Sequence, residues 1–224
     1  MPNPTPEYLA PATYVDSDHP RVIAYAEAHT LPEQSPTEKA VALFLAVRDD
    51  FRYNPYVLHF GEEEMKASSV LTRTEGHCVD KANVYAAVCR AVGIPSRLHF
   101  ANVRNHIGTS KLEEFLQSNV LVYHGYAEVW LEGKWRIATP AFNRQLCEHL
   151  GVAPMEFDGV HDALFQEYAA PNEDGEERRF MEYLYDHGHF ADLPRDAFLE
   201  AIREYYGHLF ESKDLKKVGM KVIW

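Results

Sequence analysis

Cys78 and His124 are the two residues of this sequence whose surroundings favour covalent chemistry. Cys78 lies two residues after Gly76 and two residues before Asp80, as a residue at the N-terminus of a helix does. There the free amide N–H groups and the positive end of the helix dipole favour a thiolate, so we expect the pKa of Cys78 to be lowered. His124 lies 46 residues further on, in a strand-like segment, and would be the base for this thiol.

The residues around Cys78 predict a helix that is buried nearly all round. From Cys78 to Val92 almost every residue is small or apolar, and Gly93 then ends the helix. Arg97–Val103 is typical of a strand, so the helix leads directly into a sheet. A second helix is predicted over Pro36–Asp50, because a capping box begins at Ser35.

A pair of strands is predicted to carry His124. Asn119–Leu131 is typical of a long strand, and the Glu-Gly pair at 132–133 is a two-residue turn signal. The resulting register places Trp130 opposite Trp135. Pro140 limits the second strand or places it at a sheet edge. The residues expected to share one face are His124, Tyr126, Glu128, Ile137 and Thr139.

The remaining pattern predicts short helices and one loop around this core. We expect a single domain with its core at about 36–143 and a helical and loop extension at 144–224. The predicted elements are helices at Ala67–Thr72, Ser110–Gln117 and Gln145–Leu150, a polar loop at Pro171–Glu177 and a closing amphipathic helix at Asp196–Phe210.

The charge balance and the motifs exclude several classes of partner. The 22 basic and 34 acidic residues give a net charge of −12 without a basic stripe, which disfavours nucleic acid and anionic membranes and favours a cationic or neutral substrate. The sequence lacks paired metal-ligating cysteines, a calcium loop and a phosphate-binding glycine loop, so no metal and no cofactor are implied.

The cysteines and the N-terminal residues favour a cytoplasmic location. The first residues have neither the basic nor the apolar region of a signal peptide, and no run of about 18 apolar residues occurs. Cys78 and Cys89 would lie about 16 Å apart on one helix, beyond the ~7 Å Cα limit for a disulfide. A reducing compartment is therefore the simpler interpretation.

Two segments resemble the core of the transglutaminase-like superfamily, which includes transglutaminases, peptide N-glycanases and microbial cysteine proteases. They are GHCVDKANVYAAVCRAVGIPSR and YHGYAEVWLEGKWRIATPAFN, and the resemblance covers roughly Ala67 to Asn143. It implies an α+β fold of the papain-like, transglutaminase-core type, in which a central buried helix carrying the cysteine packs on an antiparallel sheet. It also implies that Cys78 is the nucleophile and His124 the general base.

The third catalytic position departs from the pattern that this resemblance implies. The tryptophan that precedes the family aspartate by four matches Trp135, so the aspartate position falls on Thr139. A threonine hydroxyl can accept the imidazole N–H but carries no charge to stabilise an imidazolium. Asn143 is the second candidate, as in papain-like enzymes, and Glu128 or Asp158 could supply a carboxylate from elsewhere.

These residues predict acyl chemistry at amide bonds. The Cys78 backbone N–H is a ready donor to an oxyanion, and the resemblance suggests a side-chain donor from an upstream segment, for which Tyr53 is the candidate. We expect a peptide or protein substrate, with water or an amine as the acceptor, as in a protease, an amidase or a transglutaminase. The alternative is a binding or scaffold protein that keeps the fold while Thr139 has weakened or abolished catalysis.

Overall fold

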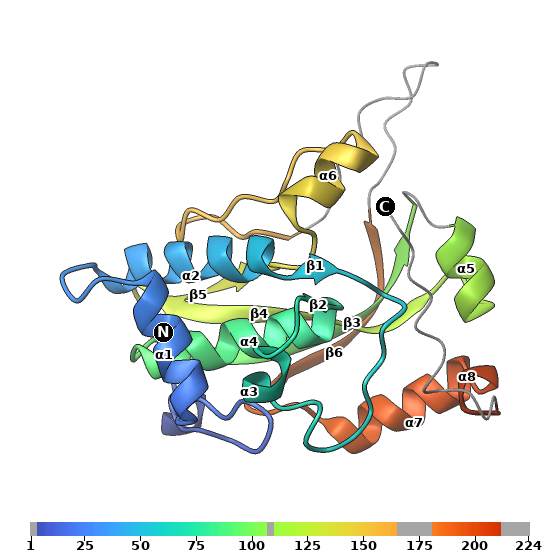
Figure 1. Ribbon diagram of the computed structural model, residues 1–224, viewed down its shortest axis with the longest axis horizontal. Helices are drawn as coiled ribbons and strands as arrows, with labels where there is room; N and C mark the ends of the chain where they lie inside the picture. Colours follow the sequence, from blue (N-terminus) through green and yellow to red (C-terminus); the bar gives the residue numbers. More distant parts are fainter. Residues whose placement is uncertain (1–3, 107–109, 165–180, 212–224) are drawn as a thin grey trace.

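The chain folds around one antiparallel sheet, seen in a computed structural model that describes residues 4–106, 110–164 and 181–211 (Figure 1). The strands follow the order β5-β4-β3-β6, so β5 and β6 form the two edges. Each neighbouring pair in this sheet is antiparallel. The four strands are β3 Ser96–Asn105, β4 Leu121–Leu131, β5 Lys134–Ala138 and β6 Met181–Phe190.

Helix α4, Cys78–Ala91, lies across one face of the sheet and forms the centre of the core (Figure 1). All residues from Val79 to Arg90 are buried, as the run of small and apolar residues predicts. The predicted α+β fold, a buried helix carrying Cys78 on an antiparallel sheet, is confirmed. Three further helices contact α4, namely α1 Pro20–His29, α2 Pro36–Asp50 and α3 Ala67–Val70.

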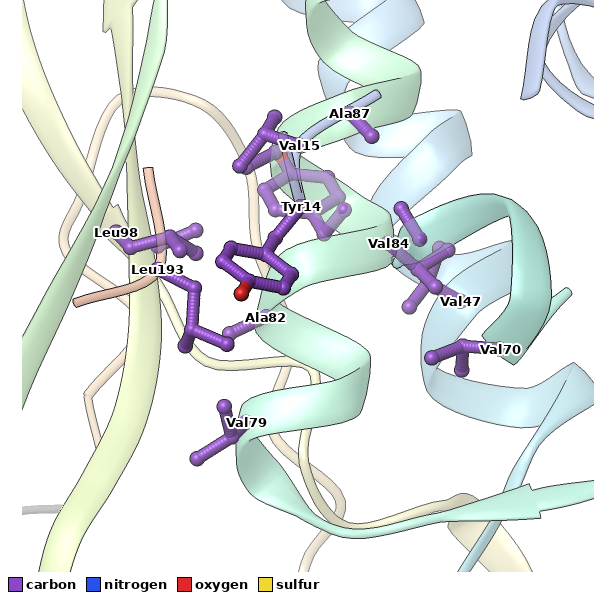
Figure 2. Packing of buried hydrophobic residues seen from close by; sticks show 14 of the residues in the cluster. Tyr14, Val15, Val47, Val70, Val79, Ala82, Val84, Ala87, Leu98 and Leu193 are labelled. Carbon is purple, nitrogen blue, oxygen red and sulfur yellow. The ribbon is translucent and has the colours of Figure 1, made fainter. Parts of the chain in front are cut away.

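Apolar side chains pack on both sides of α4, which is why the helix can be buried all round. Val84 points toward Val47 and Val70 of the neighbouring helices α2 and α3 (Figure 2). Leu98 of β3 and Leu193 lie on the other side of α4 (Figure 2). Each buried side chain of this size contributes about 1.5–3 kcal/mol, so the position of α4 is fixed by contacts on every face.

The predicted helices are present, with one change near the C-terminal end. Helix α2 has the predicted bounds, and its capping box forms, with the Ser35 Oγ accepting the Glu38 N–H at 3.2 Å. The predicted closing helix is divided in two because Tyr206 leaves helical geometry, with φ −131° and ψ 40°. In the described part of the chain, no helix is long and apolar enough to cross a membrane. The remaining helices are α5 Ser110–Leu116, α6 Arg144–Leu150, α7 Arg195–Tyr205 and α8 His208–Glu211.

The β4–β5 hairpin has the predicted register. Trp130 pairs with Trp135, and their ring centroids lie 5.4 Å apart. Ala127 pairs with Ala138. Both turn residues, at 132–133, have positive φ angles, 50° and 80°, as a tight hairpin turn of two residues requires. Strand β5 lies at the sheet edge, where a following proline is tolerated.

Several elements were not predicted, because their sequence signals are weak. Strand β6 is an edge strand in which only Met181 is buried, so its sequence lacks a core-facing alternation. Strands β1 Arg52–Tyr53 and β2 Glu75–Gly76 form a parallel pair of two residues each, too short for a periodic pattern. Helix α1 and the 3-10 turn η1, Pro6–Tyr8, were also missed. The predicted loop at Pro171–Glu177 lies outside the described residues.

Arg90 ties three parts of the chain, two of them distant in sequence, to the end of α4. Its guanidinium donates to the backbone oxygens of Ser96 at 2.9 Å, Ala10 at 2.8 Å and Ala191 at 2.5 Å. Burial lowers the pKa of Arg90 to about 10, and carbonyl acceptors satisfy its N–H groups. This arginine therefore joins the end of α4 to the start of β3, to the segment between β6 and α7, and to the N-terminal segment.

Candidate active site

Cys78 is the first residue of α4 and is held there by the residues on either side of it. The His77 Nδ1 accepts the Val79 N–H at 3.2 Å, and the Asp80 carboxylate accepts the His77 N–H at 3.1 Å. Arg73 lies 3.6 Å from the second Asp80 oxygen. Together these bonds cap the helix and place the Cys78 side chain at its N-terminal end, as the sequence predicts.

Gly125 allows strand β4 to approach the first turn of α4. A Cβ atom at this position would lie 3.0 Å from the Val79 Cα, closer than side chains normally come. The backbone N–H of Gly125, with those of Val79 and Cys78 itself, interacts with the Cys78 thiol and favours its ionised form. The close approach brings His124, the residue before Gly125, to the same end of the helix.

Cys78 and His124 both lie in the wall of one cavity of about 60 Å³. Residues 121–124 of β4 and the start of α4 form one part of this wall. We call the enclosed space the Cys78 cavity. Helices α5 and α7 and the chain after β1 form the rest, and Tyr53 also lines it. The structure therefore brings together three of the five predicted site residues, which lie 25 and 46 residues apart in the sequence.

Both reactive groups are neutral at pH 7 in this resting structure. Burial raises the pKa of Cys78 to about 11, although three backbone N–H groups act in the opposite direction. Burial alone lowers the pKa of His124 to about 4. The predicted lowered pKa of Cys78 is therefore wrong, because the loss of water around the sulfur outweighs the helix N-terminus. Cys78 nevertheless keeps part of its surface exposed.

His124 and Thr139 are buried with their polar side-chain atoms unpartnered. Within the described residues, neither ring nitrogen of His124 nor the Thr139 hydroxyl has a hydrogen-bond partner. The paired residues of the β4–β5 hairpin end at Ala127 and Ala138, so Thr139 follows the last residue of β5. The Thr139 backbone N–H donates to the Ala163 oxygen at 3.0 Å. The role of Thr139 as the partner of the imidazole stays a prediction.

Asn143 and Tyr53 are joined to each other. The Asn143 Oδ1 accepts the Tyr53 backbone N–H at 3.0 Å, so this oxygen holds β1 in place. The Tyr53 ring packs edge-on against Phe142, with centroids 4.6 Å apart. Burial, with a smaller effect from Cys78, raises the Tyr53 pKa well above its ordinary value, so the hydroxyl keeps its proton and can donate. Both catalytic roles remain predictions.

The two carboxylates considered as alternatives have other partners. Glu128 accepts from Arg97 at 2.8 and 2.5 Å and also contacts His99. Asp158 accepts the backbone N–H of His161 at 2.7 Å in an exposed turn. Neither carboxylate has a hydrogen bond to His124, and both interpretations are therefore unsupported.

Two residues that secure the site were missed by the sequence analysis. The buried Lys81 ammonium donates to the backbone oxygens of Arg48 and Phe51, each at 2.8 Å, and so joins α4 to the segment before β1. Burial lowers its pKa to about 7. Gly125 had a detectable signal, because a glycine inside a strand pattern often marks a close backbone approach. In the described part of the chain, no three His, Cys, Asp or Glu side chains are grouped to hold a metal.

Comparison with known proteins identifies a family and several structures of similar fold. The sequence profile of the transglutaminase-like superfamily matches residues 23–140, more than half of the chain. A search of curated proteins gave no match. Three solved structures are similar. A candidate cysteine protease from Cytophaga hutchinsonii is 20% identical with a TM-score of 0.46, and the match covers 59% of this chain and 40% of that one. For the periplasmic domain of TgpA from Pseudomonas aeruginosa the identity is 22% and the TM-score 0.42, with 59% of this chain and 45% of that one covered. For an arylamine N-acetyltransferase from Mycobacterium abscessus the identity is 13% and the TM-score 0.46, with 96% of this chain and 75% of that one covered. The chain thus spans less than half of the first two proteins.

Proposed function

Because this chain belongs to the transglutaminase-like superfamily, we propose that it is a cysteine-dependent enzyme that hydrolyses or transfers acyl groups at amide bonds of peptides or proteins. One observation carries the proposal: Cys78, at a capped helix N-terminus, and His124, from a distant strand, line the same cavity. A thiol and an imidazole at one cavity wall are the minimum that nucleophilic catalysis by cysteine requires.

The neutral state of both groups determines how the proposed reaction begins. The thiol proton moves to His124 while the sulfur attacks the carbonyl carbon, because the thiol is almost entirely protonated beforehand. The backbone N–H groups of Cys78 and Gly125 and the Tyr53 hydroxyl would donate to the oxyanion. His124 then gives the proton to the leaving amine, and water or a second amine releases the acyl group from the sulfur.

The third member of the site is assigned by position. Thr139 occupies the position of the family aspartate, and its buried, unpartnered hydroxyl can accept an imidazole N–H. We rank Asn143 second, since its side-chain oxygen already holds the Tyr53 backbone. Without a carboxylate the imidazolium lacks a charged partner, so turnover should be slower than with an aspartate.

The wider setting is also proposed from the sequence. The net charge of −12 favours neutral or cationic substrates over nucleic acid and anionic membranes. All three cysteines are free, which supports a reducing, cytoplasmic location.

The test is cleavage of a mixed pool of fluorogenic peptide amides, with hydroxylamine added to trap the acyl enzyme. We expect acylation of the Cys78 peptide by mass spectrometry and a loss of at least about 1,000-fold in turnover for Cys78→Ala. Cys89→Ala, which removes a buried thiol from the same helix, is the matched control and should keep turnover.

A second candidate, a binding or scaffold protein, is favoured by the neutral thiol and by the lack of a carboxylate at position 139. It predicts that peptides bind equally well to the native protein and to Cys78→Ala, and that no acyl enzyme forms with any member of the pool.

A further inference from the structure

The Cys78 cavity is lined almost entirely by hydrocarbon. Leu112 and Leu116 of α5 and Phe198 and Ile202 of α7 line it, and each is at most 7% exposed. Leu58, from the chain after β1, adds a further apolar side chain. Among the residues that the structure describes, no Lys, Arg, Asp or Glu side chain lines this cavity.

The polar groups in the wall are already engaged or neutral. The Tyr206 hydroxyl donates to the Val120 oxygen at 2.5 Å and accepts the Val122 N–H at 2.9 Å. Because this hydroxyl is already engaged, Tyr206 contributes its apolar ring to the cavity wall. The His77 Nδ1 accepts the Val79 N–H, and burial lowers the pKa of its ring. A charged group entering the cavity would lose its water and find no counter-charge, which is strongly unfavourable.

The size of the cavity limits what can enter. Its volume is about 60 Å³, less than half that of an apolar cavity of about 150 Å³ that takes up benzene. One water-sized group needs about 10–15 Å³ of such space, so the cavity holds roughly four to six of these groups, as in a short aliphatic chain.

We propose that this cavity is the acyl-group subsite and that it selects a short, uncharged aliphatic acyl group. This group is either a simple acyl chain or, in a peptide, the small aliphatic side chain next to the carbonyl carbon. The inference rests on the proposed function of Cys78 and deepens it, because the same cavity holds the nucleophile and the group it would acquire. Leu116 of α5 and Ile202 of α7 are part of the wall, so their side chains would limit the space for the acyl group.

The inference is tested with p-nitrophenyl esters, which report on acylation alone. The Cys78 sulfur forms a bond to the acyl carbon as the carbon–oxygen bond to p-nitrophenolate breaks, and the thiol proton passes through His124 to the leaving oxygen. Water then adds its hydroxyl to the acyl carbon as the carbon–sulfur bond breaks, and its other proton restores the thiol. The products are the carboxylic acid and p-nitrophenol, and no other reactant is needed.

The panel contains the acetate, butyrate, octanoate, benzoate and the anionic hemiglutarate ester. We expect kcat/KM for acetate and butyrate to exceed that for octanoate and benzoate by about tenfold or more, and that for hemiglutarate by about 100-fold. Leu116→Ala and Ile202→Ala, which enlarge the cavity, should raise the octanoate-to-acetate ratio by about tenfold. Leu31→Ala is the matched control, because it makes the same Leu-to-Ala substitution at a side chain that is 56% exposed and does not line the cavity. It should leave the octanoate-to-acetate ratio unchanged.

The outcomes separate this inference from the function on which it rests. Acylation of Cys78 with equal rates for short, long and charged esters would overturn the subsite while leaving the cysteine chemistry intact. The same conclusion would follow if Leu116→Ala and Ile202→Ala left the ester ratio unaltered. If no ester acylates Cys78 in the folded protein, the proposed function fails and the subsite fails with it.

Discussion

The neutral state of the resting thiol can be tested directly by alkylating Cys78 with iodoacetamide at different pH values. A thiol of pKa about 11 is ionised in about one molecule in 10,000 at pH 7, whereas a thiol at the ordinary value of 9.0 is ionised in about one in 100. Since only the thiolate reacts, the folded protein should label about 100-fold more slowly than the same cysteine in an unfolded peptide.

The assay follows the labelled Cys78 peptide by mass spectrometry from pH 6 to pH 10.5. A synthetic peptide spanning 73–84 serves as the reference, and circular dichroism confirms that the protein stays folded. The shape of the curve is the decisive quantity, because restricted access lowers the rate equally at every pH. We expect the rate constant to rise about tenfold per pH unit up to pH 10, and to keep this shape in His124→Gln, since His124 carries no charge in this range.

A plateau below pH 8 would refute this reasoning. It would mean that the thiolate exists at neutral pH and is paired with an imidazolium, as the helix N-terminus alone would suggest. Loss of that plateau in His124→Gln would then identify the pair as its cause.

Three further outcomes follow from the buried polar groups. Thr139→Asp should raise the pKa of His124 and increase turnover about tenfold, which is a larger change in turnover than Asn143→Ala should cause. If steady-state assays show that Asn143→Ala changes turnover more, the role of orienting the imidazole belongs to Asn143. The folded-state pKa of His124 is about 4 against 6.5 when unfolded, so the stability it supports is complete above pH 6.5 and falls by about 3 kcal/mol as the pH drops through 4. Urea unfolding of His124→Phe should lack this part of the pH dependence, and an unchanged profile would contradict the assignment. Lys81→Met should lower the free energy of unfolding at pH 7 by about 2 kcal/mol, because two buried carbonyl oxygens lose their hydrogen-bond donor. Chemical denaturation measures this free energy, and an unchanged value would mean that water replaces the ammonium and that the prediction is wrong.

Local sequence determined the elements that carry the site. The capping box at Ser35 sets the start of α2, and the run of small residues after Cys78 makes α4 a helix that can be buried all round. The two-residue turn sets the hairpin register that pairs Trp130 with Trp135. Each of these signals acts over a few residues, so it can be interpreted without knowledge of the fold. The family resemblance added the prediction that Cys78 and His124 belong to one site.

The tertiary structure alone decided the environment of that site. The pKa values of Cys78 and His124 depend on how much water the surrounding elements exclude, and those elements include α5 and α7, whose contacts with the cavity are far from Cys78 in the chain. Periodicity can predict a helix such as α7 but not the cavity that its apolar face closes. Desolvation is a sum over everything within a few ångströms, and sequence neighbours supply only part of it. For this reason the sequence could identify the thiol while predicting the wrong direction for its pKa.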